Sequence, residues 1–124
     1  MSSEPSILII DDIVENIDIL ERLLNKEGFK IFTATEGPKG LHLLKEHDID
    51  LVLLDISMPV IDGVTMLENI RKDNSLSDVA IIMLTANDDI KMALKCLKIG
   101  ACGYITKPFS MEQLHQQIDH CLKK

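Results

Sequence analysis

The chain is poor in aromatic residues, in cysteine and in long apolar runs. Only 3% of its 124 residues are aromatic and none is Trp, so any hydrophobic core has to be aliphatic. The three cysteines are odd in number and show no CxxC spacing, which favours free thiols in a reducing cytoplasm over a disulfide framework. The N-terminal apolar run, residues 7–10, is too short for a signal peptide or a membrane span.

An excess of positive charge is also absent. The formal net charge is −7, which argues against a nucleic-acid-binding domain, because such a domain neutralises phosphates with Lys and Arg. The acidic balance suits a cation site, although most of the 20 carboxylates are expected only to keep the protein soluble. Apolar residues make up 46% and charged residues 27%, which indicates one globular domain over residues 1–124.

Short apolar runs alternate with amphipathic stretches along the chain. The runs predict strands at residues 7–10, 29–33, 50–54, 79–84 and 103–106. The amphipathic stretches predict helices at residues 13–27, 38–46, 62–72, 88–99 and from a Ser110–Gln113 capping box to the chain end. In the first helix, Ile13, Ile17, Leu20 and Leu24 are spaced to form one inward face.

The pattern is (βα)5, an α/β fold. Because the strands are continuous apolar runs, both faces of the sheet are expected to be covered by helices. Right-handed crossovers then give a doubly wound parallel sheet. Five strands of this kind commonly take the order 2-1-3-4-5, with ligands bound where strands 1 and 3 end.

Reactive side chains follow the predicted strands. Asp11 and Asp12 follow the first strand, Asp55 the third, Thr85 the fourth and Lys107 the fifth. Strands 1 and 3 are neighbours in the expected order, so three carboxylates converge and need a counter-charge. Two unit charges about 4 Å apart repel by roughly 4 kcal/mol at an effective dielectric near 20. Mg²⁺, a hard cation with oxygen ligands, is the natural one. Together with an ammonium and a hydroxyl group, these parts can hold a phosphoryl group.

On these residues the chain resembles the receiver domains of two-component response regulators, the CheY-like family. The resemblance rests on Asp11-Asp12, on residues 55–63 (Asp-Ile-Ser-Met-Pro-Val-Ile-Asp-Gly), on Thr85-Ala86 and on residues 107–109 (Lys-Pro-Phe). It implies a flavodoxin-like, CheY-like fold and a phosphoryl group accepted by Asp55 from a sensor histidine kinase or a phosphotransfer protein. It also implies a Lys107–Pro108 peptide bond in the cis form.

The resemblance also implies a role for each site residue. Asp12, Asp55 and the backbone carbonyl of Ser57 ligate Mg²⁺ (with Mn²⁺ as a substitute), and Asp11 acts through a metal-bound water. Thr85, Lys107 and the backbone amides of Ile56 and Ala86 contact the phosphoryl oxygens. Thr85 and Tyr104 form the switch, and Ser57 and Asn87 tune the phosphoryl lifetime. The protein is then no enzyme beyond its own phosphotransfer and dephosphorylation.

The same family implies a cytoplasmic protein whose face of helix 4, strand 5 and helix 5 changes on phosphorylation to regulate an effector protein. The exposed stripe of Lys91, Lys95 and Lys98 is either a solvated face or part of that docking surface. No direct DNA binding, no membrane contact and either a monomer or a phosphorylation-dependent homodimer are expected. The absence of a linker after the last helix favours a stand-alone receiver over a fragment of a longer regulator.

Simpler alternatives exist for each residue and for the function. Asp12 is a favoured type of residue for capping the first helix, and Asp62-Gly63 fits a helix start with close packing. A flavodoxin-like electron carrier would need a phosphate loop rich in Gly and hydroxyl groups where this chain has Asp11-Asp12. A haloacid-dehalogenase-like phosphatase would carry an Asp-x-Asp motif after the first strand, which this chain lacks. A receiver that is never phosphorylated and serves only as an interaction module is the remaining alternative.

Overall fold

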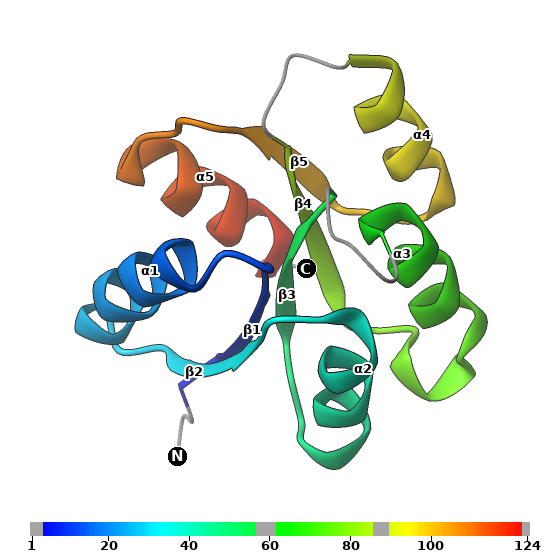
Figure 1. Cartoon of the computed structure of the whole chain (residues 1–124), viewed down its shortest axis with the longest axis horizontal. Coiled ribbons are helices and arrows are strands. Elements are labelled where there is room, and N and C mark those ends of the chain that lie inside the picture. The colour runs from blue at the N-terminus through cyan, green and yellow to red at the C-terminus, as the bar shows by residue number, and fades with distance from the viewer. Residues whose placement is uncertain (1–3, 57–61, 86–89, 123–124) are drawn as a thin grey trace.

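A computed structural model describes residues 4–56, 62–85 and 90–122 of the protein. In these residues, five strands and five α-helices alternate along the chain (Figure 1). The strands are β1 (Ser6–Ile10), β2 (Lys30–Ala34), β3 (Leu51–Asp55), β4 (Ala80–Thr85) and β5 (Gly103–Thr106). The helices are α1 (Val14–Lys26), α2 (Gly37–Glu46), α3 (Gly63–Lys72), α4 (Ile90–Ile99) and α5 (Met111–Leu122), with a short 3-10 helix, η1 (Asn74–Leu76).

The strands form one parallel sheet in the order β2-β1-β3-β4-β5, which confirms the predicted topology. Helices α1 and α5 cover one face of the sheet, and α2, α3 and α4 cover the other (Figure 1). The winding therefore reverses between β1 and β3. The carboxyl ends of these two strands lie side by side at the edge where a doubly wound sheet binds its ligands.

The two faces of the sheet explain why the central strands are uninterrupted apolar runs. Side chains alternate between the faces along a strand, so Ile7 and Ile9 enter the core under α1 and α5, while Leu8 and Ile10 enter the core under α2 to α4. All residues of β1, β3 and β4 are buried. The edge strands differ: most of β2 is half-buried, and β5 alternates between buried and half-buried residues, because a single neighbouring strand covers each.

The helix ends confirm most of the predicted local signals. Gly28 has φ +95°, the left-handed conformation that glycine adopts without a steric penalty. The Ser110–Gln113 capping box is formed, with N···O distances of 3.0 and 3.1 Å. Asp62 caps α3 by accepting a 2.8 Å hydrogen bond from Thr65 N. The connection between α3 and β4 contains η1, which is capped by Asp73 accepting from Ser75 N at 3.0 Å.

The alternative that Asp12 caps the first helix does not hold, since the N-cap residue is Ile13 and no side chain makes the capping bond. One prediction for this helix is wrong. Ile13 does not join the inward face: it is 46% exposed, whereas Ile17, Leu20 and Leu24 are buried. The helix starts one residue later than the spacing indicated, so Ile13 precedes the first helical turn.

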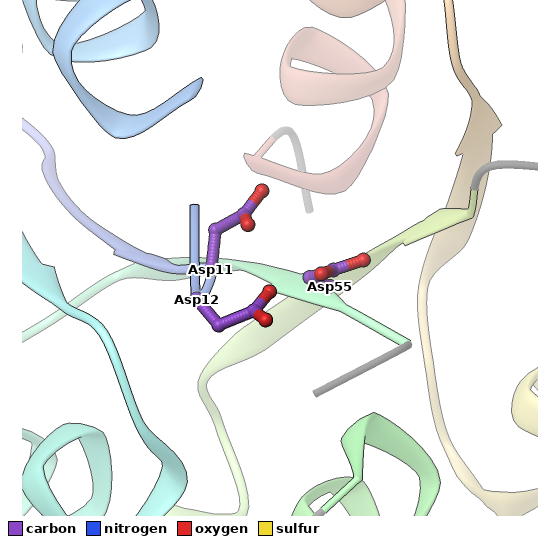
Figure 2. Close-up of side chains that lie close together, drawn as sticks. All are labelled: Asp11, Asp12 and Asp55. Atoms are coloured by element: carbon purple, nitrogen blue, oxygen red, sulfur yellow. The ribbon is translucent and has the colours of Figure 1, made fainter. Parts of the chain in front are cut away.

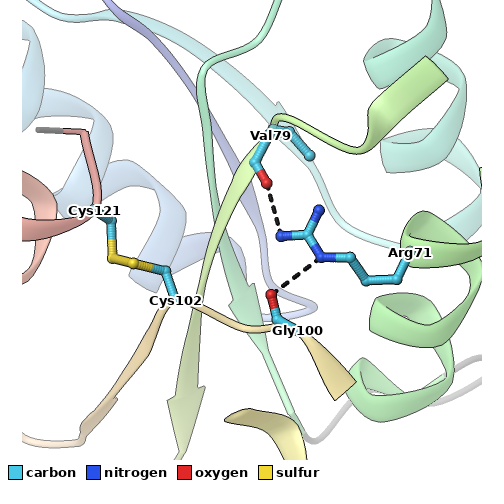
Figure 3. The surroundings of a disulfide bond; sticks show 5 residues. All are labelled: Arg71, Val79, Gly100, Cys102 and Cys121. Atoms are coloured by element: carbon cyan, nitrogen blue, oxygen red, sulfur yellow. Dashed lines mark hydrogen bonds between the residues drawn. A yellow bond between two sulfur atoms is a disulfide. The ribbon is translucent and has the colours of Figure 1, made fainter. Parts of the chain in front are cut away.

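The prediction of free thiols is wrong for two of the three cysteines. Cys102 and Cys121 form a disulfide between the loop that precedes β5 and the last turn of α5 (Figure 3). Cys96 is the free cysteine among the described residues, and it is fully buried. The two paired cysteines are 19 residues apart, and only the packing of α5 on β5 brings them together.

Candidate functional site

The sheet register brings Asp11 and Asp55 to the same place. Ile10 pairs with Leu54 in the last register position between β1 and β3, and the two aspartates are the next residues on each strand. Asp11 N continues the sheet pattern by donating to Ala34 O at 3.1 Å. Two buried strands therefore end in carboxylates that face each other across the point where the winding reverses.

Three carboxylates gather at this point. Asp11, Asp12 and Asp55 each offer an oxygen, and these atoms all lie within 4.8 Å of one another. Figure 2 shows the three side chains together at the ends of β1 and β3. Asp11 is 0% exposed and Asp55 4% exposed, whereas Asp12 is exposed. The cluster therefore has a buried inner part and a side that faces solvent.

Lys107 supplies positive charge to the buried part of the cluster. Its Nζ lies 3.2 Å from Asp11 Oδ2 and 3.5 Å from Asp55 Oδ1. The residue is held just beyond β5 by a 2.7 Å hydrogen bond from its backbone N to Thr85 O. The Lys107–Pro108 bond that follows is cis, as the resemblance implied. One ammonium group shared by two buried carboxylates leaves the cluster with a net negative charge.

Asp11 is held in place mainly by the start of α1. Its Oδ1 accepts a 2.9 Å hydrogen bond from Ile13 N, and its Oδ2 accepts from Asn16 Nδ2 at 3.4 Å. The sequence reasoning missed Asn16, which lies in the first turn of α1. Its position five residues after Asp11 is the signal that could have indicated it.

Thr85 and Tyr104 lie on neighbouring strands close to the cluster. Thr85 ends β4, is 7% exposed, and pairs in register with Thr106. Tyr104 pairs with Met83, two register positions earlier, and packs half-buried against the core under α2 to α4. The structure therefore brings the predicted hydroxyl donor to the same sheet edge as Asp55 and places the predicted aromatic residue one strand away.

The Ile56 amide, which the resemblance assigned to a phosphoryl oxygen, is hydrogen-bonded within the sheet in this structure. Ile56 N donates a 2.9 Å hydrogen bond to Leu84 O, which continues the β3–β4 ladder one residue past Asp55. Ile56 O in turn accepts a 2.8 Å bond from Gly63 N. A Cβ on Gly63 would collide with the backbone of Asp55 and Ile56, so the close packing expected of this glycine is confirmed.

Three residues with predicted roles lie outside the described part of the chain. They are Ser57, proposed as a metal ligand and rate-tuning position, Ala86, proposed as an amide donor, and Asn87, the second rate-tuning position. The structure brings together Asp11, Asp12, Asp55, Thr85 and Lys107 at the edge where the other three were expected.

The donor set fits a hard divalent cation. The oxygens of the three aspartates are close enough to share one ion, and the exposed Asp12 leaves one side open to water. Mg²⁺ prefers a few carboxylates together with retained waters, whereas a Zn²⁺ site would call for nitrogen or sulfur ligands. No His or Cys belongs to this group of ligands among the described residues.

Comparison with known proteins identifies the class to which this fold and site belong. The chain belongs to the response regulator receiver domains, because the family model described as "Response regulator receiver domain" matches residues 7–119. It is 39% identical over 124 residues to "Probable transcriptional regulator ycf27" of Guillardia theta, which covers 100% of this chain and 48% of that protein. It is 33% identical over 120 residues to "DNA-binding dual master transcriptional regulator RpaA" of Synechocystis sp., which covers 97% of this chain and 50% of that one. The chain spans about half the length of the curated relatives it matches.

Solved structures show the same fold. A response regulator receiver domain protein from Clostridium thermocellum superposes with a TM-score of 0.88 at 31% identity, over 95% of this chain and 94% of that one. CheY in a complex with CheX, BeF3 and Mg from Borrelia burgdorferi superposes with a TM-score of 0.92 at 33% identity, over 98% and 92% of the two chains. The predicted CheY-like α/β fold is therefore confirmed.

These findings confirm the predicted function at the level of the family. The chain is a receiver domain of two-component signalling, from a class of regulators that acts with histidine kinases, and a flavodoxin-like electron carrier is not favoured. An acidic cluster stands where such domains bind Mg²⁺. No helix among the described residues is both long and apolar enough to cross a membrane.

Proposed function

We propose that Asp55 is the phosphoacceptor of this receiver domain. The observation that carries the proposal is the convergence of the nearly buried Asp55 carboxylate with two further carboxylates and the Lys107 ammonium at one sheet edge. An Asp55 oxygen attacks the phosphorus of a phosphohistidine on a sensor kinase or a phosphotransfer protein. The P–N bond breaks, imidazole leaves, and an aspartyl phosphate forms.

The other side chains hold the group that is transferred. Lys107, which pairs with Asp55 before the reaction, stays within reach of an oxygen on the new phosphoryl group. Thr85 adds a hydroxyl donor from the end of β4. Asp12 would hold Mg²⁺ together with Asp55 and the Ser57 carbonyl, and Asp11 would act through a metal-bound water. When bound, Mg²⁺ supplies positive charge that offsets the charge of the three carboxylates and the phosphoryl oxygens.

The expected output is a change in the face formed by α4, β5 and α5. The Thr85 hydroxyl turns toward the phosphoryl group, Tyr104 turns inward, and an effector protein binds the rearranged face. The exposed Leu94 and Leu97 lie among the lysines of α4 and give this face an apolar element. The extent of switching is limited by how differently the two conformations contact the phosphoryl group.

The domain is proposed to act in the cytoplasm without binding DNA itself, which its net charge of −7 supports. It has no activity on other substrates and catalyses only its own phosphotransfer and dephosphorylation. Its relatives are named as transcriptional regulators, one of them as DNA-binding, and this chain spans about half the length of each.

Phosphorylation is tested by incubating the protein with acetyl phosphate and Mg²⁺ and measuring its intact mass. We expect the wild type to gain one phosphoryl group and Asp55→Asn to gain none. EDTA should abolish the gain in the wild type. Asp119→Asn on the exposed surface of α5 is the matched control and should behave like the wild type. A gain of the same size in Asp55→Asn would falsify the assignment.

A further inference from the structure

The Cys102–Cys121 disulfide joins two elements that the proposed phosphorylation chemistry does not use. Cys102 lies in the loop between α4 and β5, and Cys121 lies in the last turn of α5. Their Cα atoms are 5.9 Å apart, inside the range of about 4.4–6.8 Å that a disulfide needs. The backbone therefore holds the two sulfur atoms within bonding reach without moving.

The α4–β5 loop is anchored by contacts with two helices, α3 and α5 (Figure 3). On the side of α3, Arg71 Nε donates a 3.1 Å hydrogen bond to Gly100 O. On the side of α5, the disulfide holds Cys102, whose backbone N donates to Ile81 O at 2.7 Å. Opening the disulfide removes the covalent tie to α5 and leaves the hydrogen bonds to Arg71 and Ile81.

The two cysteine residues differ in exposure. Cys102 is half-buried and lines a surface hollow of about 470 Å³ together with Tyr104, Gln116 and His120. Cys121 is only 2% exposed. Cys121 lines a different hollow, so exposure alone favours Cys102 as the residue that a small thiol or disulfide reaches first. The hollow beside Cys102 is within the usual size range of ligand pockets, about 300–1,000 Å³.

The third cysteine, Cys96, is not expected to take part in thiol–disulfide exchange. Cys96 is 0% exposed, and burial raises the pKa of its thiol, so it offers little thiolate to a reagent. Exchange is therefore confined to the other pair.

We propose that Cys102 and Cys121 are a reversible redox-modification site that exchanges with low-molecular-weight disulfides and thiols of the glutathione class. In oxidation, the Cys102 thiolate attacks the small disulfide, forms a mixed disulfide and releases one thiolate. The Cys121 thiolate then attacks the Cys102 sulfur and releases the second. The cysteine pair loses two electrons and two protons, and the small disulfide becomes two thiols.

The site lies next to Tyr104. This residue is two positions after Cys102 and lines the same hollow, so closing the disulfide fixes the chain segment that leads into the tyrosine. The redox state is therefore expected to change the surroundings of Tyr104 and the order of the α4–β5 loop. Any consequence for signalling rests on the proposed function, whereas the thiol chemistry does not.

Thiol counting tests the exchange. The 124-residue protein is equilibrated without oxygen in buffers of different reduced-to-oxidised glutathione ratio. The exchange is quenched with acid, the protein is unfolded and its free thiols are alkylated with N-ethylmaleimide. The intact mass then gives the number of maleimides added. With three cysteines in the chain, we expect three maleimides under reducing conditions and one under oxidising conditions, reversibly. The Cys96→Ala variant should add two maleimides under reducing conditions and none under oxidising conditions. Loss of a single thiol, a stable glutathione adduct, or a disulfide that reducing buffer leaves closed would overturn the proposal.

A second measurement tests what the exchange does to the loop. Tyr104 is the one tyrosine in a chain without Trp, so intrinsic emission reports on it alone. We expect the emission to differ between the redox forms of the wild type and of Cys96→Ala, and not in Cys102→Ser. Oxidation should raise the Tm by roughly 10 °C, the size expected from closing a loop of about 20 residues. Unchanged emission and Tm across the thiol transition would count against the proposal.

Neither measurement uses Mg²⁺ or a phosphoryl donor. A protein that passes both and is not phosphorylated would refute the function proposed for Asp55 and keep the redox site. A protein that is phosphorylated on Asp55 and fails the thiol count would refute the redox site alone.

Discussion

Arg71 and Lys107 each bring a positive charge to the sheet, but at opposite ends and to different partners. Arg71 lies near the amino ends of β4 and β5 and donates to backbone carbonyls, including Val79 O at 2.7 Å and Gly100 O at 3.1 Å. Lys107 lies beyond the carboxyl end of β5 and faces two carboxylates, Asp11 and Asp55. Carbonyl groups are neutral, whereas carboxylates are charged and can bind a cation or react with a phosphoryl group.

The difference separates a structural contact from a reactive one. The Arg71 guanidinium makes four hydrogen bonds to main-chain carbonyls, and burial lowers its pKa. Three carboxylates surround the single ammonium group of Lys107, so that end of the sheet keeps an excess of negative charge. We expect substitutions at Arg71 to affect stability and substitutions at Lys107 to affect phosphorylation.

The largest effect is expected for Lys107→Met. Losing a positive donor to the phosphoryl oxygens should lower the rate of phosphorylation by acetyl phosphate by about 100-fold or more, the usual loss for removing one such donor. The rate is followed by intact mass at saturating Mg²⁺. Lys98→Met, which removes an exposed lysine of α4, is the matched control and should keep the wild-type rate. A wild-type rate in Lys107→Met would remove this lysine from the site.

Arg71→Met is expected to act on stability. It leaves the carbonyls of Val79 and Gly100 without their donor, which should lower the free energy of unfolding by about 2–3 kcal/mol, the range for lost hydrogen bonds to a charged group. Urea denaturation measures the loss, and Lys72→Met on the exposed neighbour is the control. The phosphorylation rate of the folded variant should stay within about twofold of the wild type. A large fall in that rate would mean that the two ends of the sheet are coupled.

The smallest effect is expected for Asp73→Asn. Hydrogen bonds from the Ser75 side chain and backbone, followed by the charge of Lys45, lower the pKa of the Asp73 carboxyl. A lowered pKa in the folded state means that the stabilisation is complete above the unfolded value, about 3.9, and is lost as the pH falls from there through the folded value. The substitution should therefore cost a little stability at pH 7 and progressively less below about pH 4. Urea denaturation at pH 7 and below pH 4 measures the free energy of unfolding of both proteins, and an equal loss of stability at the two pH values would contradict this prediction.

Much of the fold follows from local patterns in the sequence. Each central strand is a run of buried aliphatic residues, and the Ser110–Gln113 pair marks the start of α5 as predicted. The position of Asp11 and Asp55 directly after such strands was enough to predict that they meet. These features were predictable because each depends on residues close together in the chain and on one rule of strand order.

The features that were missed depend on contacts distant in the chain. Nothing in the spacing of three cysteines indicates that Cys102 and Cys121 meet across α5. Arg71 looks like an ordinary basic residue in the last turn of a helix, yet it reaches a carbonyl 29 residues away. The resemblance assigned the Ile56 amide to the phosphoryl group. Its hydrogen bond to Leu84 O depends on how far β4 runs beside β3, which the sequence around Ile56 does not show.

The hydrogen bond from Gly63 N to Ile56 O has a further consequence for protein engineering. It joins Ile56, the residue after β3, to Gly63, the first residue of α3, so β3 and α3 are tied to each other where the connection leaves one and enters the other. Loop-closure entropy rises only slowly with length, by about 0.6 kcal/mol for each doubling. This connection is therefore a natural graft site: segments from other receiver domains, of equal or somewhat greater length, can be exchanged there while β3 and α3 keep their positions.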